Sequence, residues 1–67
     1  MKVWVFRSRK DYIDLYYDFD AARDAQDKDN CCTIEDHIRD GREVGGSKEE
    51  GVFYIDDGGS IELMEVR

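Results

Sequence analysis

Residues 12–30, YIDLYYDFDAARDAQDKDN, contain the change of hydrophobic period that decides the fold class. In the first six of them every second side chain is Ile13, Leu15 or Tyr17, a period of two that is typical of a β-strand with its apolar side toward a core. After Tyr17 the pattern takes the period of a helix. A strand that leads directly into a helix indicates an α+β protein.

The stretch after Tyr17 carries the signals of a helix over residues 20–29. Asp18 or Asp20 can supply the N-cap carboxylate, and Asn30 is an acceptable C-terminal stop. Alanines favour the helical backbone. Two ion pairs at i,i+4 spacing add about 0.2–0.5 kcal/mol each, Arg23 with Asp27 and Asp24 with Lys28. The side of this helix toward the sheet is expected to comprise Phe19, Ala22 and Ala25.

Two further stretches have the composition of strands. Residues 2–7, KVWVFR, are β-branched and aromatic on both sides, which is typical of a central strand, and with residues 12–17 they predict a β-hairpin. The two sides of this strand carry Val3 with Val5 and Trp4 with Phe6. Residues 52–66, VFYIDDGGSIELMEV, predict a second hairpin that turns at DDGGS.

Residues 31–40, CCTIEDHIRD, allow two structures. Alternation of apolar residues favours a strand, interrupted at Asp36. The alternative is a short helix, in which Thr33 and Asp36 form a capping box and Gly41 follows the C-cap. The polar, glycine-bearing residues 41–51 are expected to form a mobile loop.

These elements predict a single small α+β domain over residues 1–67, with the order ββα followed by further strands. One antiparallel or mixed sheet of four to five strands would carry a single short helix on one face. One helix cannot cover such a sheet, so the second face must be polar or must meet a partner or a second copy of the chain. The aromatic candidates for this uncovered face, as a partner-binding or homodimer surface, are Trp4, Phe6, Tyr12, Tyr16 and either Tyr54 or Phe53.

The chain is acidic, with 17 acidic and 10 basic residues and a formal net charge of −7. Residues 1–10 hold four basic residues and no acid, so the negative charge lies in the rest of the chain. Such a protein repels nucleic acid and anionic membranes and is attracted to basic protein surfaces. We expect a protein partner with a basic surface, without direct nucleic-acid binding. No membrane binding is expected either, because no apolar run approaches the about 20 residues of a membrane helix.

Cysteine usage indicates the compartment. Cys31 and Cys32 are adjacent and point to opposite sides of an extended chain, so we expect no disulfide between them. Reduced thiols are typical of cytoplasmic proteins. The start of the chain also lacks the apolar region of a signal peptide, and we therefore expect a cytoplasmic protein.

No metal, cofactor or catalytic set is expected. Counted from Asp27, an EF-hand loop needs glycine at its sixth position, where this chain has Cys32. Zinc requires four ligands, and Cys31, Cys32 and His37 supply at most three. A nucleophile pair of Cys31 and His37 requires the segment to fold back, which a strand does not do. A chain this short also seldom encloses a ligand pocket of about 300 Å³ or more, and we expect no enzymatic activity.

The aspartates after residue 10 form the candidate binding face. Asp20, Asp24 and Asp27 recur at helical neighbour spacing, and a row of carboxylates can take the place of nucleic-acid phosphates toward a groove of Arg and Lys. The alternative is a solvated helix side whose acids favour the positive N-terminal end of the helix. With its neighbours, the candidate acidic face comprises Asp14, Asp18, Asp20, Asp24 and Asp27.

The order of KVWVF, YIDLYYDFDAARDAQ and CTIEDH resembles that of very small, uncharacterised phage-encoded acidic domains, in which a hairpin leads to an alanine-rich helix. The resemblance covers the first half to two thirds of the chain and concerns architecture, so it assigns no functional residue. It implies a protein that binds a host protein in the host-cell cytoplasm, as anti-CRISPR and anti-restriction inhibitors do.

We therefore expect a non-enzymatic inhibitor whose acidic face contacts a basic surface of a host defence or nucleic-acid-handling protein. One alternative is a homo-oligomeric sponge for a small molecule or nucleotide, with Arg7, Arg9 and Lys10 as anion ligands. Another is an accessory structural protein without an activity of its own.

Overall fold

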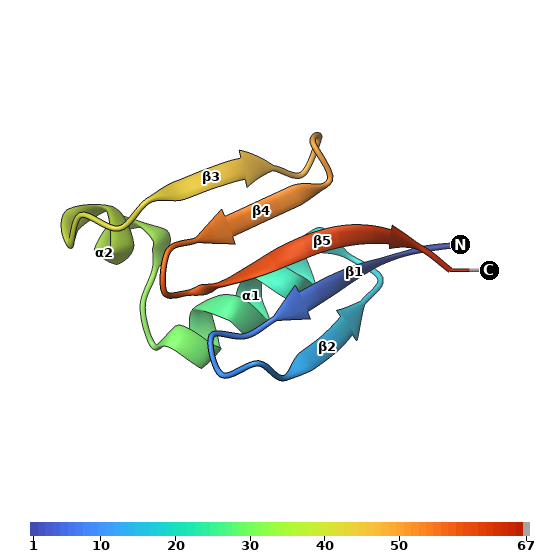
Figure 1. Cartoon of the computed structure of the whole chain (residues 1–67), viewed down its shortest axis with the longest axis horizontal. Coiled ribbons are helices and arrows are strands. Elements are labelled where there is room, and N and C mark those ends of the chain that lie inside the picture. The colour runs from blue at the N-terminus through green and yellow to red at the C-terminus, as the bar shows by residue number, and fades with distance from the viewer. Residues whose placement is uncertain (67) are drawn as a thin grey trace.

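Five strands and two helices are present in residues 1–66, which are the residues that the structure, a computed structural model, describes (Figure 1). In chain order they are β1 (Lys2–Arg7), β2 (Ile13–Tyr16), α1 (Phe19–Asn30), α2 (Ile34–Arg39), β3 (Val44–Ser47), β4 (Val52–Ile55) and β5 (Gly59–Glu65). The expected α+β class is confirmed, with a second helix that was not the favoured prediction.

The strands form one antiparallel sheet in the order β2-β1-β5-β4-β3. Both predicted hairpins are present, since β1 pairs with β2 and β4 pairs with β5. Strand β5 also pairs with β1, from Lys2 opposite Glu65 to Arg7 opposite Ser60, and so joins the first and last segments of the chain. Strand β1 therefore has a neighbour on each side, as its apolar composition predicts.

Helix α1 lies across one face of the sheet, behind β1 and β5 in Figure 1. It begins at Phe19 because Asp18, in an extended conformation, accepts a hydrogen bond from the backbone N–H of Asp20 at 3.2 Å. Of the two caps considered, Asp18 is the one used, and Phe19 is the first residue of the helix. The helix ends at Asn30 because Cys31 adopts a left-handed conformation with φ of 55°.

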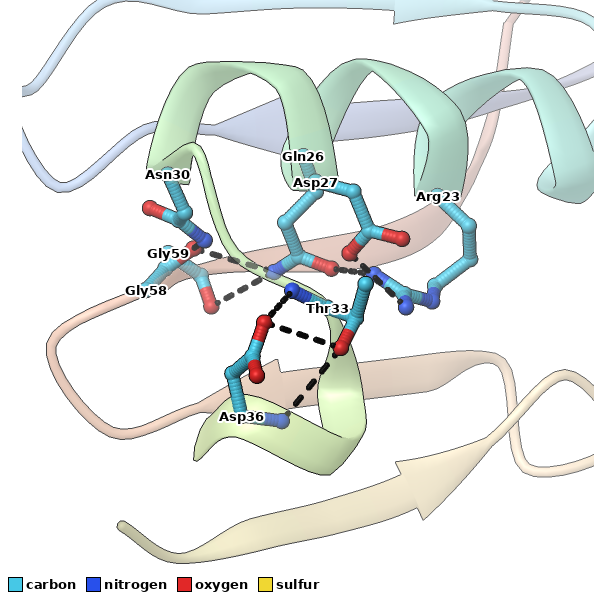
Figure 2. A network of polar contacts seen from close by, with 8 residues as sticks. All are labelled: Arg23, Gln26, Asp27, Asn30, Thr33, Asp36, Gly58 and Gly59. Carbon is cyan, nitrogen blue, oxygen red and sulfur yellow. Dashed lines mark hydrogen bonds and ion pairs between the residues drawn. The ribbon is translucent and has the colours of Figure 1, made fainter. Parts of the chain in front are cut away.

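Two buried polar side chains fasten the second half of α1 to the β4–β5 turn, and no sequence pattern indicated them. Gln26 Nε2 donates to the carbonyl oxygens of Gly58 and Gly59, each at 3.1 Å. Asn30 Nδ2 donates to the Gly58 carbonyl at 3.0 Å, so three bonds join one helix side to one turn (Figure 2). Directional bonds of this kind fix the position of a helix that apolar contact alone would leave less specified.

Residues 34–39 form helix α2, so the favoured strand over residues 31–40 is wrong and the alternative helix is correct. Its capping box is complete: Thr33 Oγ1 accepts from the Asp36 backbone N–H at 3.3 Å, and Asp36 Oδ2 accepts from the Thr33 backbone N–H at 3.0 Å. These bonds satisfy backbone groups locally, whereas a strand would need a neighbouring strand to pair with them. The period of two was therefore the weaker signal.

Residues 44–47 form strand β3 at the edge of the sheet, so the loop expected over residues 41–51 is interrupted by a strand. Two glycines explain both the loop-like composition and the pairing with β4. Gly45 leaves room for the ring of Tyr54, and Gly46, with φ of 79°, lies against the backbone of Val52. A side chain at either position would overlap these atoms.

The core lies between α1 and the sheet. Its buried apolar side chains are Trp4, Phe6, Ala22, Phe53, Ile55 and Ile61. Phe6, Ile61 and Phe53 lie opposite one another on three neighbouring strands. Phe19 of α1 contacts Trp4 and Phe53 edge to face, with ring centroids 4.9 Å and 6.0 Å apart. The predicted helix side supplies buried Ala22 with half-buried Phe19 and Ala25.

Candidate functional site

The five predicted acidic residues do not form a single free row. Asp14 lies on β2 opposite Phe6 and so projects on the helix-covered side of the sheet. Asp18 is the N-cap of α1, and its Oδ1 is used by the helix backbone. The three remaining acids, Asp20, Asp24 and Asp27, lie along α1. The predicted spacing on the helix is present, but the acids differ in what they contact.

Asp27 belongs to a partly buried network. Its Oδ1 lies 3.0 Å from Arg23 Nη2, without hydrogen-bond geometry, and the two side chains are 34% and 14% exposed. Arg23 also donates to Gln26 Oε1 at 2.6 Å and lies over the Phe53 ring, 4.8 Å from its centroid. The carboxylate therefore balances an arginine that packs on the core, and Figure 2 shows both beside the Gln26 amide.

Asp24 has a partner as well. Its Oδ2 lies 2.9 Å from Lys28 Nζ, and the hydrogen bond and charge of this carboxylate raise the pKa of Lys28. Both side chains are exposed, so the pair contributes little to the free energy of unfolding. Asp20 makes no ion pair with another residue of the range 1–66. The acidic helix therefore presents fewer unpaired charges than its composition suggests.

The predicted aromatic face is largely wrong, because the structure places most of its members on the helix-covered side. Trp4 and Phe6 are buried in the core, and Tyr16 lies opposite Trp4 and packs against the same cluster. Burial raises the pKa of Tyr16, and the nearby charge of Asp14 raises it further. These aromatic rings pack between the sheet and the alanine-bearing side of α1, so they are unavailable to a partner.

The other predicted aromatics divide between the two sides. The Tyr12 hydroxyl donates to Asp29 Oδ1 of α1 at 2.7 Å, and this bond raises the pKa of Tyr12. Of the pair considered together, Phe53 is buried, whereas Tyr54 lies on the uncovered side over Gly45. Tyr54 is therefore the one predicted aromatic residue of the set that the open face retains.

The open face of the sheet, as we define it, carries aliphatic and aromatic side chains that neither helix covers. Strand pairing places Leu15 opposite Val5, and Val3 opposite Met64. Two large apolar side chains of β2 on this face are mostly open to solvent: Leu15 is 63% exposed and Ile13 is 51% exposed. The exposed apolar residues of this face and its margin include Ile13, Leu15, Tyr17, Val52, Tyr54 and Met64.

Sequence reasoning assigned Ile13, Leu15 and Tyr17 to the core, and this is also wrong. The alternation of β2 was detected, but its two sides were exchanged. A signal was available, since a hairpin places Leu15 beside Val5 and Ile13 beside Arg7, away from Trp4 and Phe6. Near Val3 these side chains border a hollow of about 120 Å³, lined by Val3, Leu15, Tyr16 and Tyr17.

The thiols and the histidine do not form the nucleophile pair that was considered. Cys31 is exposed and donates to the Lys28 carbonyl at 3.7 Å, and Cys32 is half-buried; both are free thiols. The segment does fold back as α2, yet in residues 1–66 no hydrogen bond joins either sulfur to His37. Within the same range no group of three or more His, Cys, Asp or Glu side chains is arranged to hold a metal ion.

Neither helix in the described part of the chain has the length and apolar character needed to cross a membrane. Comparison of the chain with protein-family models, with curated proteins and with solved structures found no match.

Proposed function

We propose that this chain is a non-enzymatic protein-interaction domain that binds a partner protein through the open face of its sheet. The observation that carries the proposal is the group of exposed apolar side chains on that face, of which Leu15, Ile13 and Met64 are each about half exposed or more. Exposed apolar side chains gathered on one face of a small protein mark an interaction site more often than singly scattered ones do. Strand β2, at one edge of the sheet, contributes Ile13 and Leu15 to it.

Charge supports a partner with a basic surface. Glu62 lies on the open face in register between Val5 and Val52, so a carboxylate stands among the apolar side chains. The net charge of −7 attracts basic proteins from a distance, while apolar contact holds them once bound. Proteins that handle nucleic acid, including defence proteins of a host cell, present such basic surfaces. We propose an inhibitor of this class of protein, acting in the cytoplasm, where the free thiols Cys31 and Cys32 would stay reduced.

The acidic helix takes a different role in this proposal from the one expected from the sequence. Asp18 and Asp27 serve the structure of α1, as cap and as partner of Arg23. Asp20 and Asp24 are exposed and contribute to the long-range field. In this proposal Asp20 and Asp24 attract the partner from a distance, and the open face is the surface that contacts it.

The test is affinity purification from cells with two variants that carry the same added charge. Leu15→Glu places a carboxylate on the open face, whereas Ala21→Glu places one on the exposed side of α1. We expect Leu15→Glu to lose the co-purifying protein and Ala21→Glu to retain it, because a buried, unpaired charge weakens binding by about 100-fold or more. Once the partner is identified, titration calorimetry at two salt concentrations gives the affinities.

Three outcomes would contradict the proposal. Equal capture by both variants would show that the open face is not the contact surface. Light scattering of the purified chain at twice its monomer mass, returned to the monomer by Leu15→Glu, would identify a second copy as the occupant of this face. Affinity that is independent of salt would remove the role of Asp20 and Asp24 in steering.

A further inference from the structure

A cavity of about 340 Å³ lies at the end of the molecule opposite the chain termini. The β1–β2 turn, the C-terminal end of α1, helix α2 and the β4–β5 turn converge there, as Figure 1 shows. The cavity is lined by Arg9, Asn30, Cys32, His37, Arg42 and Asp57. Its volume lies within the about 300–1,000 Å³ of small-molecule sites, a size that so short a chain seldom encloses.

The cavity wall is formed where the backbone reverses direction at the end of α1 and again at the end of α2. Cys31, with φ of 55°, ends α1 and turns the chain so that α2 can begin at the Thr33 cap. After α2, Gly41 with φ of 81° reverses the chain again, and the Arg42 backbone N–H donates to the His37 carbonyl at 2.9 Å. The wall therefore consists of short elements whose ends are each fixed by hydrogen bonds.

His37 is the most buried polar residue of this wall, at 2% exposed. Its Nδ1 lies 3.1 Å from Arg42 Nη1. A guanidinium can only donate, so Nδ1 accepts and the imidazole proton lies on Nε2. Nε2 is buried and has no hydrogen-bond partner among residues 1–66. A buried N–H without an acceptor is unfavourable, and an acceptor atom of a ligand would satisfy it.

Asn30 adds a second buried group of the opposite kind. Its Nδ2 donates to the Gly58 carbonyl at 3.0 Å, which fixes the orientation of the amide. Its Oδ1 is turned away from the two glycine carbonyls in Figure 2, and this atom is buried without a donor among the described residues. Asn30 and His37 thus both line the cavity, and each has one buried polar atom without a hydrogen-bond partner among residues 1–66.

The lining of the cavity is richer in basic residues than the chain as a whole. Two arginines and one carboxylate, Asp57, line it, whereas the chain as a whole carries −7. Arg9 makes no ion pair with a carboxylate of residues 1–66. Arg42 Nη1 lies 3.5 Å from Asp40 Oδ2 as well as near His37, and its side chain is 35% exposed. Asp40 balances part of the charge of Arg42, so Arg9 is the lining arginine without an ion pair in this range, and guanidinium groups bind oxyanions through paired hydrogen bonds.

We propose that this cavity binds a small oxyanion that also carries hydroxyl groups, such as a sugar phosphate or a sugar acid. Arg9 and Arg42 hold the anionic group, His37 Nε2–H donates to one of its oxygens, and Asn30 Oδ1 with Asp57 accepts from the hydroxyl groups. The site is complete within one chain. Of the anion ligands expected from the sequence it uses Arg9, while Arg7 lies on the open face opposite Ile13 and neither Arg7 nor Lys10 lines the cavity.

The test is an NMR titration of the ¹⁵N-labelled chain with ribose 5-phosphate, gluconate and uncharged ribose at constant ionic strength. We expect saturable shifts of the Asn30 side-chain amide and the His37 ring with at least one of the two anions, and none with ribose. The phosphate and carboxylate arms decide which oxyanion is preferred. Arg9→Gln should weaken the binding by about tenfold or more, because it removes a charged donor from the cavity.

Arg7→Gln is the matched control, since it removes the same charge from the same hairpin at a residue that does not line the cavity. It should change the affinity by less than about twofold. Equal loss in both variants, or shifts spread over exposed lysines without saturation, would overturn the proposal. A long-range ¹⁵N experiment on His37 adds an independent measurement: a proton found on Nδ1 in place of Nε2 would remove the donor on which the site depends.

Discussion

The two faces of the sheet carry similar apolar side chains and differ in what covers them. On the covered face Phe6 is 1% exposed beneath α1, whereas on the open face Leu15 is 63% exposed. Both belong to the hairpin of β1 and β2, and both are large apolar residues of good strand propensity. The position of α1 therefore decides which face of the hairpin becomes the core, and composition alone does not.

Polar contacts sharpen the difference. The covered side includes the bonds of Gln26 and Asn30 to the Gly58 carbonyl and the Arg23 guanidinium over Phe53. On the open face the charged residues Arg7 of β1 and Glu62 of β5 are both exposed. The covered face is thus organised by buried directional bonds, and the open face is free to meet another surface.

The largest expected effect comes from truncation of a core side chain. Phe6→Ala should lower the free energy of unfolding by about 3–5 kcal/mol, because it removes a buried ring and leaves a cavity. Leu15→Ala on the open face should cost about 0.5 kcal/mol. Urea unfolding followed by circular dichroism measures both, and equal costs would mean that Leu15 is covered in solution.

The second effect concerns the polar fastening of α1. Gln26→Leu should cost about 1–3 kcal/mol, since the Gly59 carbonyl loses the Gln26 donor, the Gly58 carbonyl keeps only Asn30, and Arg23 Nη1 loses the Gln26 acceptor. The control on the same helix is Lys28→Gln, which breaks only the exposed pair with Asp24 and should leave the free energy of unfolding nearly unchanged. Similar urea midpoints for the two variants would show that the buried amide does not fasten the helix.

These effects separate what local sequence patterns could predict from what they could not. The two hairpins and helix α1 were visible because each depends on neighbours in the chain, although the sequence left the cap open between Asp18 and Asp20. The Thr33 capping box was visible too, but the alternation around it received more weight. In residues 31–40 the side-chain bond to the backbone that Thr33 can form was a more reliable signal than the short run of alternating apolar residues.

The assignment of faces and the cavity lay beyond local patterns for a physical reason. Both sides of β1 are apolar, so the choice between them depends on contacts of Trp4 with Phe19, which are distant in sequence. The cavity collects Arg9, His37 and Asp57 from separate segments, and no spacing in the chain reports that meeting. Strand β3 was hidden because its glycines, which read as a loop, make room for the side chain and backbone of β4.

The third prediction tests the capping box that holds α2 and the cavity wall. Thr33→Ala should cost about 1 kcal/mol at neutral pH, and Thr33→Ser should retain most of the stability. Hydrogen bonds from the Thr33 backbone and hydroxyl hold the pKa of Asp36 below its usual range. A carboxyl with a lower pKa in the folded state stabilises the fold above the unfolded pKa of about 3.9, and this contribution is lost as pH falls through the folded value.

The difference between wild type and Thr33→Ala should therefore shrink below about pH 4. The backbone bond remains in the variant, so the pKa of Asp36 should rise only part of the way toward its usual range. Carbon-detected NMR titration of the Asp36 carboxyl measures this directly. An unchanged pKa in Thr33→Ala would assign the whole shift to the backbone N–H of Thr33.

The smallest effect on stability is expected at the open face, where Gly45 and Tyr54 lie opposite each other on β3 and β4. A Cβ at residue 45 would overlap the Tyr54 ring, but this ring is part-exposed and can swing into solvent. Gly45→Ala should therefore change the free energy of unfolding by less than about 1 kcal/mol, since the loss of chain entropy in the unfolded state opposes the lost contact.

The Tyr54 hydroxyl would leave Glu43 Oε1, which accepts its hydrogen bond at 3.2 Å and raises the pKa of Tyr54. We expect this pKa to fall toward its usual range, as it should in Glu43→Gln, when followed by tyrosine absorbance or NMR at alkaline pH. A raised pKa that persists in Gly45→Ala would mean that the ring is held in place, and that this part of the open face is more rigid than its exposure indicates.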